Sequence, residues 1–209
     1  INTAELDKEF KTQLTDARSA YEQALALQPD LPEAILASGM YHYLGALDFA
    51  AAELDFVAAV ELLPNSYMSH TLLGSLRRRQ GRWSEAAEQI ERAAAIEPGD
   101  FHGLSLAWDI YRALRQREPI ERAIRRVRSF DLVGLQTALY EADVQLNFDG
   151  DFERAVATLE RLHTQHFGHT LTEHPGDAFL IDYLKGAYHS QGRYQDAARL
   201  FESIAGEPE

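Results

Sequence analysis

The chain has 209 residues, of which 45% are hydrophobic and 25% are charged, a balance typical of a globular protein rather than a disordered segment. Its net charge of −13 would repel nucleic acid and anionic membranes, and no apolar run approaches the ~18 residues that a membrane span needs. The absence of cysteine excludes disulfides, thiolate nucleophiles and cysteine-ligated metals. We expect a soluble, cytoplasmic protein with no nucleic-acid or membrane partner. Because it begins at Ile1 without a signal sequence, we also expect a piece of a longer protein.

One spacing pattern recurs six times along the chain. A leading residue is followed by an apolar residue four positions later and by another three positions after that. Because such residues share one face of a helix, each copy predicts a helix with a single buried stripe. The leading residues are 35, 34, 34, 35 and 42 residues apart. In chain order the copies are Ala17-Tyr21-Ala24, Ala52-Phe56-Ala59, Ala86-Ile90-Ala93, Ile120-Ile124-Val127, Ala155-Leu159-Leu162 and Ala197-Phe201-Ile204.

Turn signals divide the chain into about twelve helices. Gly81 and Gly192 permit the positive φ with which many helices end, and Ser84 or Asp151 can cap the next helix. Prolines close the first three copies. The predicted helices are 3–13, 15–28, 32–45, 48–62, 66–80, 84–96, 100–115, 119–130, 132–147, 151–166, 176–190 and 194–205. They pair into one array over 1–209, with units at about 1–31, 32–66, 67–100, 101–135, 136–177 and 178–209.

These residues resemble the tetratricopeptide repeat, whose units pair two helices at a period of about 34 residues. The third unit is the most similar, through Leu73-Gly74, Gly81, Trp83, Ala86, Ala93 and Pro98. The resemblance implies an all-α superhelix of about six helix-turn-helix units, with the first helices lining a concave face. The chain also resembles the repeat arrays of large bacterial signalling proteins. The fourth unit departs from the pattern, because it has Trp108 and Ile120 at positions of small residues and no turn glycine. We expect it to be displaced or shortened.

A candidate partner-binding groove follows from projecting each first helix with its packing residues inward. The remaining face mixes aromatic, methionine, hydroxyl and arginine side chains, which suits an extended peptide or an inserted helix. Arg78 and Arg112 could clamp a carboxylate or a phosphorylated side chain. The alternative is that these residues are solvated surface or neighbouring core. The predicted groove residues are Leu36, Met40, Tyr43, Thr71, Ser75, Arg78, Ser105, Asp109, Arg112, Tyr140, Val144, Asn147, Asp182, Gly186 and His189.

Arginines gather in the middle of the chain, where residues 77–128 hold twelve arginines against eight acidic residues. This basic segment could accept a polyanion or an acidic protein partner. The favoured interpretation is a solvated, ion-paired face, because Glu85, Glu118 and Glu121 lie at pairing distance along the helices. The arginines concerned are Arg77, Arg78, Arg79, Arg82, Arg122, Arg125, Arg126 and Arg128.

Four histidines coincide with the one long interval between copies: His163, His166, His169 and His174. Imidazoles three apart on a helix can chelate a metal ion. Exposed loop histidines are the favoured alternative, so we predict no metal or other cofactor.

Three functions are compatible with these features. The first is an interaction scaffold that binds a peptide or helix of a partner, as a regulatory or sensor module of a larger bacterial protein. The second is self-association, because Leu200, Phe201 and Ile204 form an apolar stripe at the end of the array with no capping helix. The third is a metal-dependent or hydrolytic enzyme built on the histidines. We expect no enzymatic activity, because the sequence has no phosphate loop, nucleophile elbow or dinucleotide fingerprint.

Overall fold

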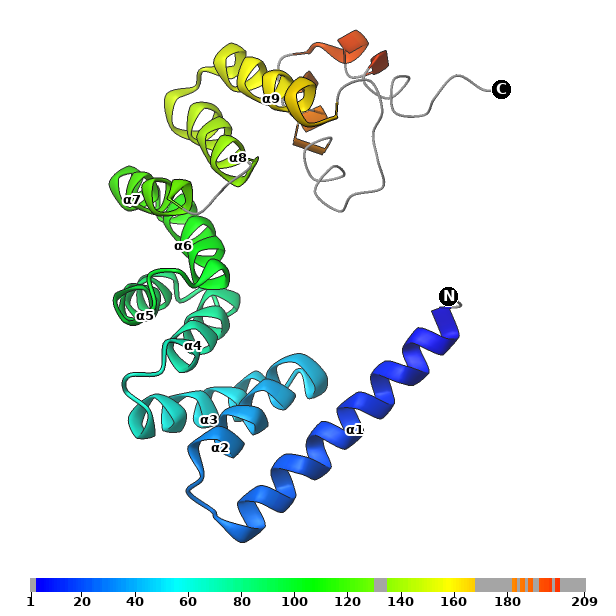
Figure 1. Ribbon diagram of the computed structural model, residues 1–209, viewed down its shortest axis with the longest axis vertical. Coiled ribbons are helices and arrows are strands. Elements are labelled where there is room, and N and C mark those ends of the chain that lie inside the picture. The colour runs from blue at the N-terminus through cyan, green and yellow to red at the C-terminus, as the bar shows by residue number, and fades with distance from the viewer. Residues whose placement is uncertain are drawn as a thin grey trace. The chain divides into compact units, whose positions relative to one another are not determined.

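The structure is a computed structural model that describes residues 3–129 and 135–167 and selected positions between 182 and 199. The chain divides into two compact modules, the N-terminal module Ile1–Leu114 and the C-terminal module Arg115–Glu209. Figure 1 shows the helices of both modules, coloured by residue number.

The N-terminal module consists of α-helices and one short π-helix. Its elements are α1 (Thr3–Leu27), α2 (Pro32–Met40), η1 (Tyr41–Ala46), α3 (Phe49–Leu62), α4 (Tyr67–Arg79), α5 (Trp83–Ile96) and α6 (Phe101–Ala113). The described part of the C-terminal module contains α7 (Arg117–Arg128), α8 (Leu135–Val144), η2 (Gln145–Asp149) and α9 (Phe152–Phe167). No strand occurs among the described residues, so the predicted all-α fold class is confirmed.

Successive helices pack as pairs that follow the predicted repeat. α2 packs against α3, α4 against α5, and α8 against α9. In the N-terminal module each pair also contacts the next, since α3 packs on α4 and α5 on α6. The described part of the chain is therefore built from tandem helix-turn-helix units, whose apolar stripes are covered by the partner helix and the neighbouring unit.

The N-terminal end differs from the prediction of two helices over 3–13 and 15–28. α1 is continuous over 25 residues. Neither glycine nor proline lies near residue 14. The hydroxyls of Thr12 and Thr15 donate hydrogen bonds to the backbone carbonyls of Lys8 and Lys11, at 3.0 and 2.9 Å. These threonines are accommodated inside the helix, so the first unit is one long helix rather than a pair.

Each described turn inside a helix pair places one residue in the left-handed region, with φ between 55° and 77°. The residues are Leu47, Gly81, Arg115, Gly150 and Gly192. Each lies five positions before the leading residue of its copy, so the turns repeat at the same intervals as the stripes. The positive φ predicted for Gly81 and Gly192 is confirmed.

The same turn corrects the expectation for the fourth unit. Its turn is not displaced, because Arg115 adopts the left-handed conformation that glycine adopts in three other units. α7 is nevertheless shorter than its counterparts, with 12 residues against 14 in α3 and α5. Trp108 and Ile120 are both buried, so the larger side chains at these positions belong to the core.

The helix caps confirm one of the two predicted capping residues. Asp151 accepts a hydrogen bond from the backbone N–H of Arg154 at 3.1 Å, as an N-cap does. Ser84 lies inside α5 instead, because that helix begins at Trp83. Asp48 caps α3 in the same way as Asp151 caps α9.

The apolar stripes form the cores of the modules. In the N-terminal module the core contains Leu36, Tyr43, Ala52, Phe56, Ala59, Leu73 and Leu76. Gly39 permits a close approach there, because a Cβ at this position would lie 2.6 Å from the ring of Phe56. In the C-terminal module the core contains Leu139, Ala142, Ala155, Val156, Leu159, Leu162 and Tyr188.

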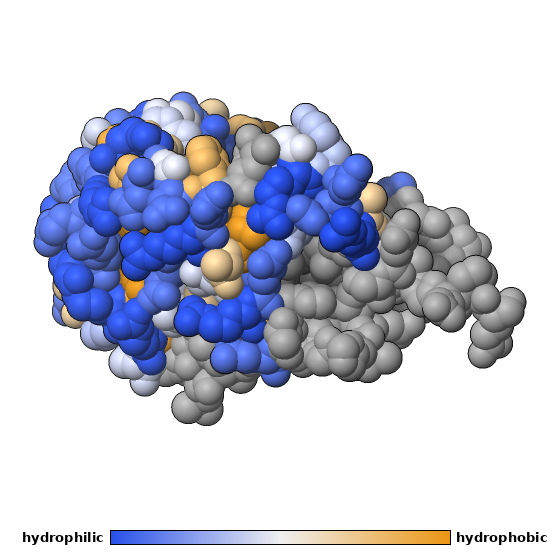
Figure 2. Space-filling model, turned by 90° about the horizontal axis from the view of Figure 1, so that it is seen from above, coloured by the Kyte–Doolittle hydropathy of each residue, from blue (hydrophilic) through white to orange (hydrophobic). Residues whose placement is uncertain are grey.

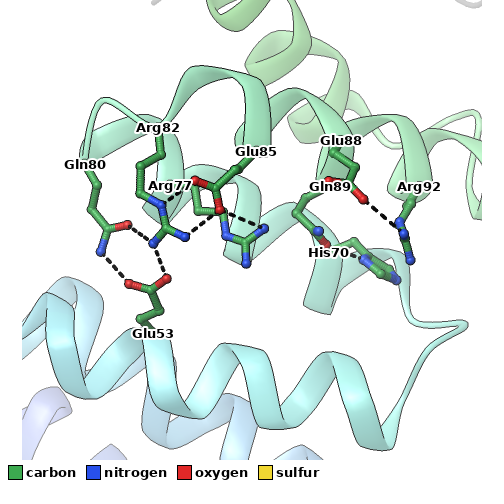
Figure 3. Close-up of polar contacts among 9 residues, drawn as sticks. All are labelled: Glu53, His70, Arg77, Gln80, Arg82, Glu85, Glu88, Gln89 and Arg92. Atoms are coloured by element: carbon green, nitrogen blue, oxygen red, sulfur yellow. Dashed lines mark hydrogen bonds and ion pairs between the residues drawn. The ribbon is translucent and has the colours of Figure 1, made fainter.

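A polar cluster joins α3 to the turn between α4 and α5 (Figure 3). Arg82 pairs with both Glu53 and Glu85, and Gln80 donates to Glu53 at 2.9 Å. Burial raises the pKa of Glu53, but the hydrogen bonds from Gln80 and Arg82 outweigh it, so the pKa lies below its ordinary value of 4.5. This carboxylate therefore contributes stability above pH 4.5 that is lost as the pH falls through its lowered pKa.

The surface is predominantly polar on the face drawn in Figure 2, where hydrophobic side chains show only as separate patches. Within the described ranges, we find no helix that combines the length and the apolar character needed to cross a membrane. The predicted helix 194–205, with the apolar stripe on which self-association depends, lies largely outside the described residues. Self-association therefore stays a prediction.

Candidate functional site

The first helices of three units enclose a groove with a volume of about 540 Å³ in the N-terminal module. We call it the α2–α4–α6 groove. α2 and η1 contribute Met40, Tyr43 and Leu44; α4 contributes Tyr67, Met68, Thr71, Leu72, Ser75, Arg78 and Arg79; α6 and the residue before it contribute Asp100, His102, Ser105, Leu106 and Asp109.

The predicted groove residues of the N-terminal module divide into two sets. Seven line the groove together: Met40, Tyr43, Thr71, Ser75, Arg78, Ser105 and Asp109. The other two do not line it. Leu36 belongs to the buried core cluster that also contains residues of α3 and α4. Arg112 is exposed and lies beside Asp109, with Nη2 at 3.9 Å from Oδ1.

The groove has more lining residues than predicted, and two of the missed ones follow a simple rule. Met68 lies three positions before Thr71, and His102 lies three positions before Ser105, so each stripe continues by one turn toward the start of its helix. Extending the projection by one turn would have found both. Arg79 was missed because it follows Arg78 directly, and successive residues normally diverge around a helix.

Apolar side chains remain accessible in the groove. The exposed fractions are 37% for Met40, 52% for Leu44 and 44% for Met68. Leu72 and Leu106 also line it and are more deeply placed. The groove therefore offers a hydrophobic surface that a partner could remove from water, which is the main source of affinity in such contacts.

Arg79 provides a cation beside that hydrophobic surface. Its guanidinium lies 4.6 Å from the centroid of the Tyr43 ring and 5.5 Å from that of Phe49, within the range of a cation–π contact. No carboxylate pairs with Arg79 among the described residues. The aromatic rings fix its position and leave its hydrogen-bond donors available to an acidic group.

The wall formed by α6 and the residue before it carries two carboxylates, each bound by a side chain of α4. Asp109 pairs with Arg78 across the groove at 3.4 Å. Asp100 accepts a hydrogen bond from the Thr71 hydroxyl at 3.0 Å. Gly103 leaves room for that carboxylate, because a Cβ there would lie 2.5 Å from Oδ2 of Asp100. These contacts hold α4 and α6 together at the polar side of the groove.

In the described part of the C-terminal module, the predicted groove residues differ in burial, and Val144 is the one that lines the hollow found there. Tyr140 and Val144 are buried, and Val144 lines a different hollow, between α7, α8 and α9. Asn147 is exposed on η2 and donates to Asp143 at 2.8 Å. Asp182, Gly186 and His189 are exposed, and His189 packs edge-on against Tyr194. The groove role predicted for these residues stays a prediction.

Most of the arginines singled out from the sequence are ion-paired. Arg77 pairs with Glu85, Arg78 with Asp109, Arg82 with Glu53 and Glu85, Arg122 with Glu118, and Arg128 with Glu141. Glu121 pairs with Arg117 rather than with a member of the predicted set. The ion-paired face is confirmed for these five arginines. Arg79, Arg125 and Arg126 have no such partner within the described ranges.

The histidine hypothesis is not tested by the described side chains. His163 and His166 lie on α9 with side chains outside the described set, and His169 and His174 lie in a stretch outside it. Among the side chains that the structure does describe, no group of three or more His, Asp or Glu residues could hold a metal ion.

Comparison with known proteins identifies the repeat. A family model described as "Tetratricopeptide repeat" matches residues 69–102, which span α4, α5 and the start of α6. No curated protein is similar enough to this sequence to count as a match.

Solved structures share the fold at low sequence identity. A tetratricopeptide repeat protein from Parabacteroides merdae is 15% identical with a TM-score of 0.77, over 99% of this chain and 78% of that one. PilF from Pseudomonas aeruginosa is 15% identical with a TM-score of 0.66, over 95% and 86%. YrrB, described as a tetratricopeptide repeat protein with an unusual peptide-binding site, is 13% identical with a TM-score of 0.59, over 88% and 90%.

The period of the stripes, the positive-φ turns at the same period, the matching family model and the shared fold all agree. Residues 69–102 match the tetratricopeptide repeat family, and the chain shares the fold of solved tetratricopeptide repeat proteins.

Proposed function

We propose that this chain is a protein-interaction scaffold that binds a peptide or a helix of a partner protein in the α2–α4–α6 groove. The observation that carries the proposal is the groove itself: the first helices of two units present accessible Met40, Leu44 and Met68 beside the cation of Arg79, which has no ion-pair partner among the described residues. The peptide-binding site reported for YrrB, a protein of the same fold, supports this use of the fold. As a regulatory or sensor module of a larger protein, the chain would bind its partner through this groove.

The groove chemistry defines the partner segment. It needs an apolar side chain to cover Leu44 and Met68, because their exposed surface gives the hydrophobic contribution. It also needs an acidic group for Arg79, whose planar guanidinium binds carboxylates through paired hydrogen bonds. A short acidic and apolar peptide meets both needs.

The proposal is tested by selecting binders from a displayed random-peptide library on the chain, then measuring affinity by calorimetry. The double variant Leu44→Ala and Met68→Ala removes the accessible apolar surface. It should weaken the selected peptides by about 5- to 30-fold, which corresponds to ~1–2 kcal/mol. Arg79→Gln should weaken those peptides that carry a carboxylate.

The matched control is Leu27→Ala with Leu54→Ala. These leucines are more exposed, at 89% and 75%, and do not line the groove. The control should bind as the parent does. If both double variants weaken binding equally, or if neither does, the peptides bind elsewhere and the groove assignment is wrong.

A further inference from the structure

A second hollow, of about 430 Å³, lies within the C-terminal module between α7, α8, η2 and α9. Four arginines line it together with three carboxylates: Arg117, Arg125, Arg128 and Arg154 with Glu121, Glu141 and Asp149. We call it the arginine hollow. Such a gathering of cations is unexpected in a chain whose net charge is −13.

Two of the four arginines are held by carboxylates. The Nε of Arg117 lies 2.8 Å from Glu121, and its other end pairs with Asp149 on η2. Arg128 pairs with Glu141 on α8. These pairs connect α7 to α8 and η2 and fix the walls of the hollow.

The other two arginines have no acidic partner. Neither Arg125 nor Arg154 forms an ion pair or a side-chain hydrogen bond within the described part of the chain, and both are exposed. Two guanidinium groups thus line one hollow without an ion-pair partner among the described residues, in excess of the three lining carboxylates that hold Arg117 and Arg128. Like charges gathered in this way repel each other, and an anion placed between them removes that repulsion.

Comparison between the units indicates that the repeat does not require these arginines. Arg117 occupies the position at which Phe49, Trp83 and Phe152 stand in other units. Arg125 occupies a position that carries valine or glutamate in the units before and after. The fourth unit has therefore replaced packing and acidic positions of the repeat with cations that converge on one hollow.

We propose that the arginine hollow binds the dianion of a phosphate monoester. A guanidinium presents its donors in a planar fork that matches phosphate oxygens, and two uncompensated guanidinium groups balance the charge of about −1.5 to −2 that a phosphate monoester carries at neutral pH. Arg125 and Arg154 contact the phosphate directly, while Arg117 and Arg128, held by their carboxylates, keep the hollow open. The site is separate from the α2–α4–α6 groove and does not depend on its function.

The test is calorimetric titration of the whole chain in a phosphate-free buffer with O-phospho-L-serine, with inorganic phosphate, and with L-serine as the reference that lacks the phosphate. Saturable binding of the first two and none of L-serine is expected. Arg125→Gln with Arg154→Gln should weaken binding at least about tenfold, because hydrogen bonds between charged groups contribute more than neutral ones.

The matched control is Arg126→Gln with Arg161→Gln. These exposed arginines lie on the same two helices and do not line the hollow, so the control removes the same charge from α7 and α9. It should bind within about twofold of the parent, since distant surface charges contribute little. Absence of saturable binding, or equal losses in the two double variants, overturns the proposal.

A third titration, with a short phosphoserine peptide, separates the two sources of the same group. Tighter binding of the peptide than of phosphoserine assigns the site to a phosphorylated protein side chain. Equal affinity assigns it to a small phosphate ester.

Discussion

The turn residue Leu47 permits a direct test of how the repeat is built. It holds φ at 55° where three other units have glycine, and its side chain is 60% exposed. The left-handed conformation costs a residue with a Cβ about 1–2 kcal/mol. Glycine avoids this strain but loses about 0.5–1 kcal/mol of additional chain entropy on folding. Leu47→Gly should therefore stabilise the N-terminal module by about 0.5–1 kcal/mol.

Two further variants separate the backbone contribution to the free energy of unfolding from that of the side chain. Leu47→Ala removes the same side chain but keeps the Cβ, so it should give no gain. Gly81→Ala introduces strain at φ 77°, where a Cβ would meet nothing within 4 Å, so it should destabilise by about 1 kcal/mol through the backbone alone.

Urea unfolding followed by tryptophan fluorescence measures these effects. The chain has two tryptophans, Trp83 on α5 and Trp108 on α6, and both report on the N-terminal module. This matters because repeat modules can unfold separately, and the midpoint should be compared at constant slope. If Leu47→Gly lowers the midpoint, or Leu47→Ala raises it as much, strain at this turn does not limit stability.

Three other predictions concern the N-terminal module. Gly39→Ala should destabilise it by about 1–3 kcal/mol in urea unfolding, because the new Cβ would lie 2.6 Å from the buried ring of Phe56; an unchanged midpoint would show that the ring yields freely. Gln89→Leu should cost about 1–3 kcal/mol in the same assay, because it removes the partner at 2.8 Å from Nδ1 of buried His70; a neutral result would mean that water replaces the amide. Glu53→Gln should make the free energy of unfolding depend less on pH below pH 4.5, because the lowered pKa of Glu53 provides stability that is lost when acid protonates the carboxylate. If the free energy of unfolding falls equally with pH in the variant and the parent, this reasoning is wrong.

The helical architecture was predictable because its causes are local. Apolar residues four and three apart define one helix face wherever they occur, and Phe56, Ile90 and Leu159 of the stripes are all buried as that rule requires. The rule failed at the N-terminus because the pattern contains no signal there. Nothing in the sequence around residue 14 breaks a helix, and α1 simply continues.

The groove was partly predictable for the same reason. Thr71, Ser75 and Arg78 follow helical spacing, so projection placed them on one face. Projection could not tell an outer position from one covered by a neighbouring helix, and it therefore placed Leu36 in the groove although this residue lies in the core. That distinction depends on helices that are far apart in the sequence.

The sequence by itself determined the period and the helix pairs that follow α1, because these depend on contacts within about one turn of helix or one repeat unit. Only the tertiary structure decided which cations are compensated. Arg82 is paired with Glu53, 29 residues away, whereas Arg79 lies against aromatic rings with no carboxylate among the described residues. Ion pairs between helices form only when packing brings the groups within a few ångströms, and no sequence spacing specifies that distance.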